Sequence, residues 1–114
     1  MRLINLTPHP LTIYGPNGVD VIPASGSLAR VRSTSEVIGE VADIPVIRPT
    51  FAEVDGLPDP QPNTFYLVSS VVLTALRSHG IHRGDVIAPA TGPNDGCIRN
   101  AQGHVQGITR FSGL

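Results

Sequence analysis

The sequence has no lysine and no tryptophan, so its eight basic residues are all arginines. Charged residues make up 15% of the chain, compared with about 25% in average soluble proteins. This low charge indicates either that a subunit interface covers part of the surface or that uncharged polar groups do. The arginines have two explanations: a GC-rich genome, or the use of planar guanidinium groups to bind anionic ligands.

The chain has a single cysteine, Cys97, which excludes an internal disulfide and a zinc cluster of several thiolates. Nine acidic residues outnumber eight basic ones, so the net charge of -1 lacks the basic excess of a protein that binds duplex nucleic acid. The apolar runs are too short for a secretory signal or for the roughly 18 residues of a membrane span. We therefore expect a cytoplasmic protein whose partners include no membrane and no duplex nucleic acid.

The chain of 114 residues suits one domain, residues 1–114, and its 40% of apolar residues can form a core. A chain of this length buries about two thirds of the surface that it exposes when unfolded. Its stability is then modest unless subunits associate, so we expect a homo-oligomer.

Valine, isoleucine and threonine supply 30 of the 114 residues, in short runs separated by eleven prolines and twelve glycines. This pattern is typical of many short strands. We expect a mostly β (α+β) fold, a compact antiparallel sheet or small barrel of short strands with one main helix. The expected strands cover residues 2–6, 11–14, 19–22, 28–32, 36–41, 44–48, 51–54, 64–68 and 85–88, followed by a hairpin of 97–100 and 104–111.

The main α-helix is expected near residues 69–79. Ser69 or Ser70 can cap its start, and Gly80 ends it. Before the helix, three alternate prolines at 56–63 predict an extended connector inside the domain. The continuous apolar run that follows the connector predicts a central strand. The buried stripe of the helix is expected to contain Val72, Ala75, Leu76 and His79.

The start of this helix is the first candidate binding element. Unpaired amide N–H groups at a helix N-terminus, together with the hydroxyls of Ser69 and Ser70, favour a phosphate or another anion. The structural alternative is that Ser69 only caps its own helix, because no glycine-rich phosphate loop precedes it.

The corner between the first two expected strands is the second candidate. A proline on each side of His9 fixes the direction of this residue, and the rigid corner can orient Thr7 and His9 toward a bound molecule. The same corner is also compatible with a solvent-facing turn.

Three arginines are candidate charge partners for an anionic ligand: Arg83 before a strand, and Arg99 and Arg110 in the closing hairpin. The alternatives are that Arg83 and Asp85 fix their loop and that the other two are solvated surface charges. The sequence shows no serine, histidine and acid arrangement and no informative carboxylate pair, so we expect no catalytic residue and no cofactor. The histidines and Cys97 are spaced too irregularly to predict a metal site.

Several short motifs occur in order along the chain: Asn5-Leu6-Thr7-Pro8-His9, Tyr66-Leu67-Val68-Ser69, Arg83-Gly84-Asp85-Val86 with Pro89 after it, and Arg99-Asn100, Gly103, Val105, Gly107 and Arg110-Phe111. In these motifs, and over most of its length, the chain resembles a group of small proteins encoded by phages, prophages and actinobacteria. The resemblance implies an accessory gene of a virus or mobile element that acts in the cytoplasm of a bacterial host. It carries over no catalytic residue, and Gly84 stands where similar proteins are expected to have a second acid.

Phage accessory proteins of this size often act without chemistry, for example by sequestering the signals of bacterial immunity. We therefore expect a non-enzymatic anti-defence protein that sequesters a small anionic, nucleotide-derived ligand, such as a cyclic nucleotide or cyclic ADP-ribose. Phe65, Tyr66 or Tyr14 would stack on its base. One alternative is a protein-binding inhibitor or small virion component, and another is a small hydrolase that acts on nucleotide linkages through a histidine.

Overall fold

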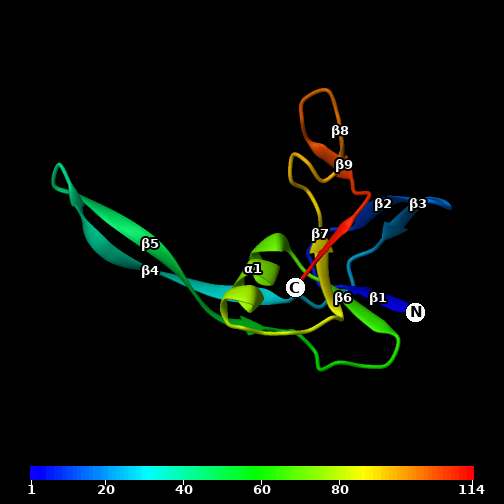
Figure 1. Cartoon of the computed structure of the whole chain (residues 1–114), viewed down its shortest axis with the longest axis horizontal. Coiled ribbons are helices and arrows are strands. Elements are labelled where there is room, and N and C mark those ends of the chain that lie inside the picture. The colour runs from blue at the N-terminus through cyan, green and yellow to red at the C-terminus, as the bar shows by residue number, and fades with distance from the viewer.

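The computed structural model describes the backbone of residues 1–114 and every side chain except those of Ser33, Phe51 and Ala52 (Figure 1). The elements follow one another along the chain in the following order: β1 (Arg2–Asn5), β2 (Leu11–Gly15), β3 (Gly18–Ile22), β4 (Arg30–Val41), β5 (Ile44–Asp55), β6 (Thr64–Leu67), α1 (Ser70–Ser78), β7 (Val86–Pro89), β8 (Ile98–Arg99), β9 (Val105–Gly107) and β10 (Phe111–Gly113).

Four strands form the central sheet, in the order β1, β6, β7 and β10. The other strands form the antiparallel ribbons β2–β3, β4–β5 and β8–β9. The expectation of a mostly β fold with one main helix is therefore confirmed, and β6 lies inside the sheet as predicted. The central sheet differs from the expected antiparallel pattern in its pairs β1–β6 and β6–β7, which are parallel. Parallel pairing joins segments far apart in the sequence, and no local pattern encodes it.

The core lies between α1 and one face of the central sheet. Alternate residues of a strand face the same side, so Tyr66 and Val68 point toward the helix together with Val86 and Ala88. Burial of large apolar side chains, worth roughly 1.5–3 kcal/mol for each one, is the main favourable contribution to stability here. The buried cluster is completed by Leu6, Ala29, Val72, Leu73 and Leu76.

Helix α1 begins and ends as the sequence predicts. The Ser69 hydroxyl accepts a hydrogen bond from the N–H of Val72 at 3.3 Å. At the other end, Gly80 adopts a φ of +70°, which lets the chain leave the helix. The N–H of Ile81 then donates to the carbonyl of Leu76 at 3.0 Å and closes the last turn.

The buried stripe of α1 differs from the prediction at one end. Leu73 is buried although it was not expected in the stripe, and His79 is the exposed C-terminal cap of the helix. The buried residues of the helix are Val72, Leu73, Ala75 and Leu76. Within the part of the chain that the structure describes, no helix is long and apolar enough to cross a membrane.

Strands β4 and β5 form a long hairpin, residues 30–55, that projects from the rest of the molecule and is called the arm below (Figure 1). Each strand has 12 residues. They are joined by Ala42 and Asp43, which both adopt positive φ angles, 52° and 64°. Two successive residues of this kind match the twist of a tight hairpin. The arm elongates the molecule, whose principal extents are 56 × 39 × 24 Å.

The arm is the largest difference from the sequence analysis, which predicts several separate short strands between residues 28 and 54. Ala-Asp is not among the dipeptides that favour a two-residue hairpin turn, so the sequence gives no turn signal there. Proline has no backbone N–H to donate to a neighbouring strand, so it fits best at the edge of a sheet. Both strands of the two-stranded arm are edge strands, and β5 can therefore contain Pro45 and Pro49.

The ribbon β2–β3 and strand β9 meet through backbone hydrogen bonds. The N–H of Tyr14 donates to the carbonyl of Ile108 at 2.8 Å, and the N–H of Ile108 donates to the carbonyl of Thr12 at 3.0 Å. Gly107 makes this approach feasible, because a β carbon there would overlap the Tyr14 ring and lie 2.9 Å from the Thr12 carbonyl oxygen.

The substitution Gly107→Ala is expected to lower the free energy of unfolding by about 1–3 kcal/mol, because the added methyl group must displace backbone. Urea denaturation measures this change. Gly84→Ala is the matched control, since nothing lies within 4 Å of a β carbon built at Gly84. Equal stability of the two variants would contradict the close approach.

Candidate functional site

The corner after β1 is held by the side chain of Asn5, which is 1% exposed. Its Oδ1 accepts hydrogen bonds from the N–H and the hydroxyl of Thr7, at 2.9 and 2.6 Å. Its Nδ2 donates to the carbonyls of His9, at 2.9 Å, and Ile22, at 3.2 Å. The two acceptor and two donor positions of the amide are therefore all in use, and they join β1, the corner and the end of β3.

The hydroxyl of Thr7 takes part in this network. It lies 2.6 Å from Asn5 Oδ1 and 3.0 Å from the His9 carbonyl oxygen, both of which are acceptors. A hydroxyl has one proton, so Thr7 can offer only its oxygen lone pairs to a further partner. The sequence prediction treats Thr7 as a ligand contact, and the structure adds that it stabilises the corner.

Four of the seven predicted site residues line one hollow: Thr7, His9, Ser69 and Ser70. This hollow, called the corner hollow below, has a volume of about 390 Å³, which lies within the roughly 300–1,000 Å³ of typical ligand pockets. Its lining combines hydroxyl groups and one imidazole with apolar walls, as in many small-molecule sites. The remaining lining residues are Pro8, Pro10, Leu11, Leu67, Pro89 and Thr91.

The corner hollow lies beyond the carboxyl ends of three parallel strands. β1, β6 and β7 run in the same direction and end at Asn5, Leu67 and Pro89. In open parallel sheets, ligands bind beyond these ends. The sequence reasoning missed Pro89 and Thr91 because it did not predict the parallel pairs. One sequence signal could have identified these two residues: the segments that line the corner hollow come directly after the strands expected at residues 2–6, 64–68 and 85–88.

The start of α1 faces this hollow through Ser69 and Ser70. The first hydrogen bond of the helix runs from the N–H of Leu73 to the carbonyl of Ser69, at 3.0 Å. The amides of Ser70 and Val71 therefore have no partner inside the helix, and the helix dipole places partial positive charge at this end. The Ser69 hydroxyl is used as the cap, whereas Ser70 is exposed.

Of the three arginines predicted as charge partners for a ligand, Arg99 contacts a residue that lines the corner hollow, Thr91. Its Nη2 donates to the carbonyl of Thr91 at 2.8 Å, and its Nη1 donates to the carbonyl of Gly103 at 2.9 Å. These two hydrogen bonds hold the exposed guanidinium of Arg99 next to Thr91, but Arg99 itself does not line the corner hollow.

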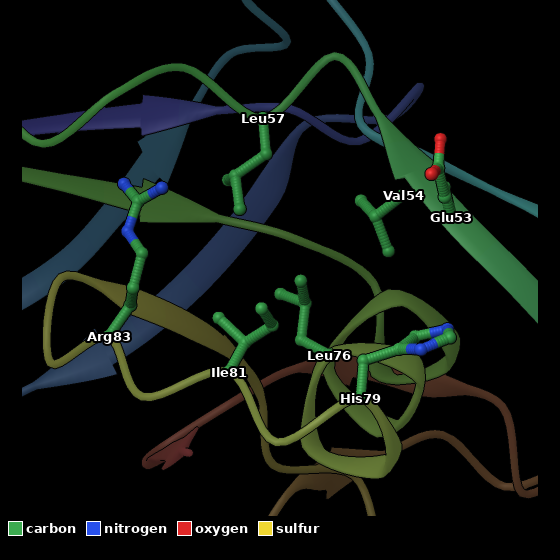
Figure 2. A pocket seen from close by; sticks show the side chains of 7 residues that line it. All are labelled: Glu53, Val54, Leu57, Leu76, His79, Ile81 and Arg83. Carbon is green, nitrogen blue, oxygen red and sulfur yellow. The ribbon is translucent and has the colours of Figure 1, made fainter.

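Arg83 lies elsewhere, in a second hollow of about 450 Å³ (Figure 2). Figure 2 shows apolar side chains in the middle of this hollow, with Arg83 at one end and Glu53 and His79 at the other. Ser69 caps one end of α1 and His79 the other, and a helix of this length spans about 13 Å. Arg83 and the corner hollow are therefore at opposite ends of α1.

The guanidinium of Arg83 makes a bidentate ion pair with Asp85. Its Nε donates to Oδ1 at 2.9 Å and its Nη2 to Oδ2 at 2.7 Å. Both side chains are more than four-fifths buried, and the Arg83 guanidinium also stacks 5.9 Å from the centre of the Tyr66 ring. The hydrogen bonds from Arg83 lower the pKa of Asp85, and the same bonds raise the pKa of Arg83. The interpretation in which this pair fixes its loop thus has a direct structural basis.

Arg110 and the tyrosines do not line the corner hollow. The Arg110 side chain is exposed, and its carbonyl accepts a hydrogen bond from the N–H of Ala90 at 3.1 Å. Tyr66 is 1% exposed and its hydroxyl donates to the Asp59 carbonyl, so it cannot stack on a bound base as the sequence analysis expects.

No family model, curated protein or solved structure matches this chain. Among the described residues, no three histidine, cysteine, aspartate or glutamate side chains come together as a metal site.

The substitution Asn5→Asp is expected to lower the free energy of unfolding by about 2 kcal/mol or more, because it removes the Nδ2 donor and leaves two carbonyl groups without it. Thermal denaturation at neutral pH measures the loss. Asn94→Asp, at an exposed loop position, is the control. If both variants melt together, Asn5 does not hold the corner.

The Arg83–Asp85 pair predicts a specific acid sensitivity. Because folding lowers the pKa of Asp85, the stabilisation that the pair contributes is complete at neutral pH and is lost as the pH falls through the folded-state pKa. Asp85→Asn should therefore lose less stability than the wild type between about pH 5 and pH 3. Denaturant titrations at several pH values test this, with Asp20→Asn in exposed β3 as the control. A variant with an unchanged acid response would contradict the role of the pair.

Proposed function

We propose that the protein is a non-enzymatic binding protein that sequesters a small anionic, nucleotide-derived ligand in the corner hollow. The observation that carries this proposal is the convergence of Thr7, His9, Ser69 and Ser70 on one hollow beyond the carboxyl ends of parallel strands. The resemblance to phage and prophage proteins supports an anti-defence role in the bacterial cytoplasm, with an immune signal as the ligand.

The chemistry of the hollow favours a ligand with one anionic group and one flat apolar part. The amides of Ser70 and Val71 and the dipole of α1 attract the anionic group. Pro8, Pro10 and Pro89 are rigid apolar walls against which a planar base can pack. Arg99 adds positive charge beside the hollow, at Thr91. Arg83 and Arg110 are not part of this proposed site.

Sequestration requires affinity and no reaction. A protein present in excess of its ligand lowers the free ligand concentration by mass action alone. His9 is the one imidazole among the side chains that line the described hollow. A hydrolase would need further groups to activate water and protonate a leaving group.

The direct test incubates the purified protein with a panel of cyclic nucleotides and cyclic ADP-ribose isomers, removes free ligand, and releases what is bound by heat denaturation. Recovery of the intact compound supports sequestration. Recovery of an altered compound would identify a hydrolase, and retention of none of the panel would contradict the proposed ligand class.

The substitution Ser70→Asp is expected to weaken binding of a retained compound at least tenfold without destabilising the fold. A carboxylate in the first turn repels an anionic ligand but interacts favourably with the helix dipole. Ser78→Asp puts the same charge at the other end of α1 and should leave binding unchanged. Affinities come from calorimetric titration and stabilities from thermal melts. Equal affinities for the two variants would place the anion away from the helix start.

A second candidate function, a protein-binding inhibitor or small virion component, is favoured by the arm. Its exposed apolar side chains are those expected of an element that contacts another protein.

A further inference from the structure

We propose that the hollow shown in Figure 2 is a second binding site, for a small zwitterion whose carboxylate and ammonium groups are separated by an apolar body, as in a short apolar peptide. This hollow, called the arm-base hollow below, lies at the opposite end of α1 from Ser69 and Ser70. The inference therefore does not depend on the nucleotide-derived ligand proposed for the corner hollow.

The arm-base hollow has an apolar middle and charged ends. Strand β5 at the base of the arm, the connector after it, the end of α1 and the loop before β7 all contribute to its wall. Its volume of about 450 Å³ is that of a typical small-molecule pocket. Val54 and Leu57 also pack against the buried core cluster, so this part of the wall belongs to the fixed body of the molecule. The apolar middle consists of Val54, Leu57, Leu76 and Ile81.

The guanidinium of Arg83 has an unused hydrogen-bonding edge at this hollow. An arginine side chain carries five N–H donors in a rigid planar fork, and Asp85 accepts two of them, one from Nε and one from Nη2. Nη1 donates to no described residue. Because no buried side-chain nitrogen or oxygen of the described residues lacks a partner, Nη1 must be open to solvent. The remaining N–H groups on Nη1 and Nη2 can bind a carboxylate through two parallel hydrogen bonds.

The same guanidinium is held in place before any ligand arrives. Asp85 fixes one edge of the group, and the ring of Tyr66 lies 5.9 Å from its central carbon. The Arg83 side chain is only 17% exposed, so it has little freedom to lose on binding. Because Asp85 also balances the charge of Arg83, the site recognises a ligand through directed hydrogen bonds and not through excess positive charge. A planar carboxylate matches that geometry.

The other end of the arm-base hollow is suited to a cation. The exposed carboxylate of Glu53 lies there together with His79, the C-terminal cap of α1 (Figure 2). The carboxyl end of a helix carries partial negative charge, which stabilises a positive group nearby. A ligand that carried only anionic groups would meet both of these negative charges. The two ends together therefore favour a zwitterion over a nucleotide.

The separation of the two ends sets a minimum length for the ligand. In a free amino acid the ammonium and carboxylate groups are attached to the same carbon, whereas apolar side chains separate Arg83 from Glu53 in the hollow. Each further residue of an extended peptide adds about 3.3–3.6 Å. Apolar side chains on the peptide would pack against the apolar middle of the wall. Leucyl-leucine is the simplest probe with these properties.

The first test titrates leucyl-leucine and related compounds into the unmodified protein by isothermal calorimetry. We expect leucyl-leucine to bind with a Kd below about 1 mM. Leucyl-leucine amide, which lacks the carboxylate, should bind at least about tenfold more weakly, because it loses charge-assisted hydrogen bonds to Arg83. The N-acetyl peptide should bind about threefold more weakly, because Glu53 is exposed and its ion pairs are weak. Free leucine, which cannot reach both ends, should also bind more weakly than the dipeptide.

Two results of this titration would overturn the proposal. One is the absence of leucyl-leucine binding at about 10 mM peptide. The other is equal affinity for all four compounds, which would show that apolar contact alone holds them. Neither result bears on the corner hollow, whose test uses other compounds.

The second test locates the bound peptide with variants. Glu53→Gln should remove the difference in affinity between the free and the N-acetylated dipeptide. Glu40→Gln, also exposed but near the turn of the arm, is the matched control and should keep that difference. Thermal melts of both variants should match the wild type, because both side chains are exposed. If the difference survives in Glu53→Gln, the ammonium group does not lie at this end and the proposal is wrong.

Arg83→Lys tests the carboxylate end. Lysine keeps a positive charge beside Asp85 but lacks the second edge of the fork, so leucyl-leucine should bind at least about tenfold more weakly. The affinity for leucyl-leucine amide should stay unchanged. An equal affinity of wild type and variant for the free dipeptide would contradict the role of Arg83. The capped peptides decide the same question on the wild-type protein if this variant does not fold.

Discussion

The buried amide of Asn5 fixes the geometry on which the rest of the site depends. Its side chain holds the corner of Thr7 and His9 against the end of β3. The main-chain carbonyl oxygen of Asn5 also accepts hydrogen bonds from the N–H and the hydroxyl of Ser25, at 3.0 and 2.7 Å. Ser25 lies in the segment that leads into the arm. One residue therefore links the wall of the corner hollow to the root of the arm, and its burial makes each lost hydrogen bond costly.

Sequence patterns predicted the features that depend on local chemistry. A serine followed by a helical apolar pattern and a glycine was enough to place α1, its cap and its end, because these depend on neighbouring residues. The continuous apolar run that became β6 indicated an interior strand. Proline on both sides of His9 indicated a rigid corner, and the structure adds that the side chain of Asn5 is what holds it.

The features that the sequence did not predict depend on contacts between distant segments. Parallel pairing of β1, β6 and β7 decides which loops meet, and it brought Pro89 and Thr91 to Thr7 and Ser69. The same pairing decides which charges stay apart: Arg83 is bound to Asp85 at the far end of α1, although its residue type suited an anion site. The arm escaped prediction because its two-residue turn, Ala42-Asp43, has no glycine or asparagine.

The corner hollow is assembled from three stretches that lie as far apart in the sequence as residues 7 and 91. None of them contains a pocket by itself, so an occupant can be held only by the fully folded chain, and occupancy opposes global unfolding by mass action. Inside a cell, proteases act on chains that open. Copies that hold a ligand would outlast empty ones, and the amount of this protein would come to follow the supply of whatever it holds.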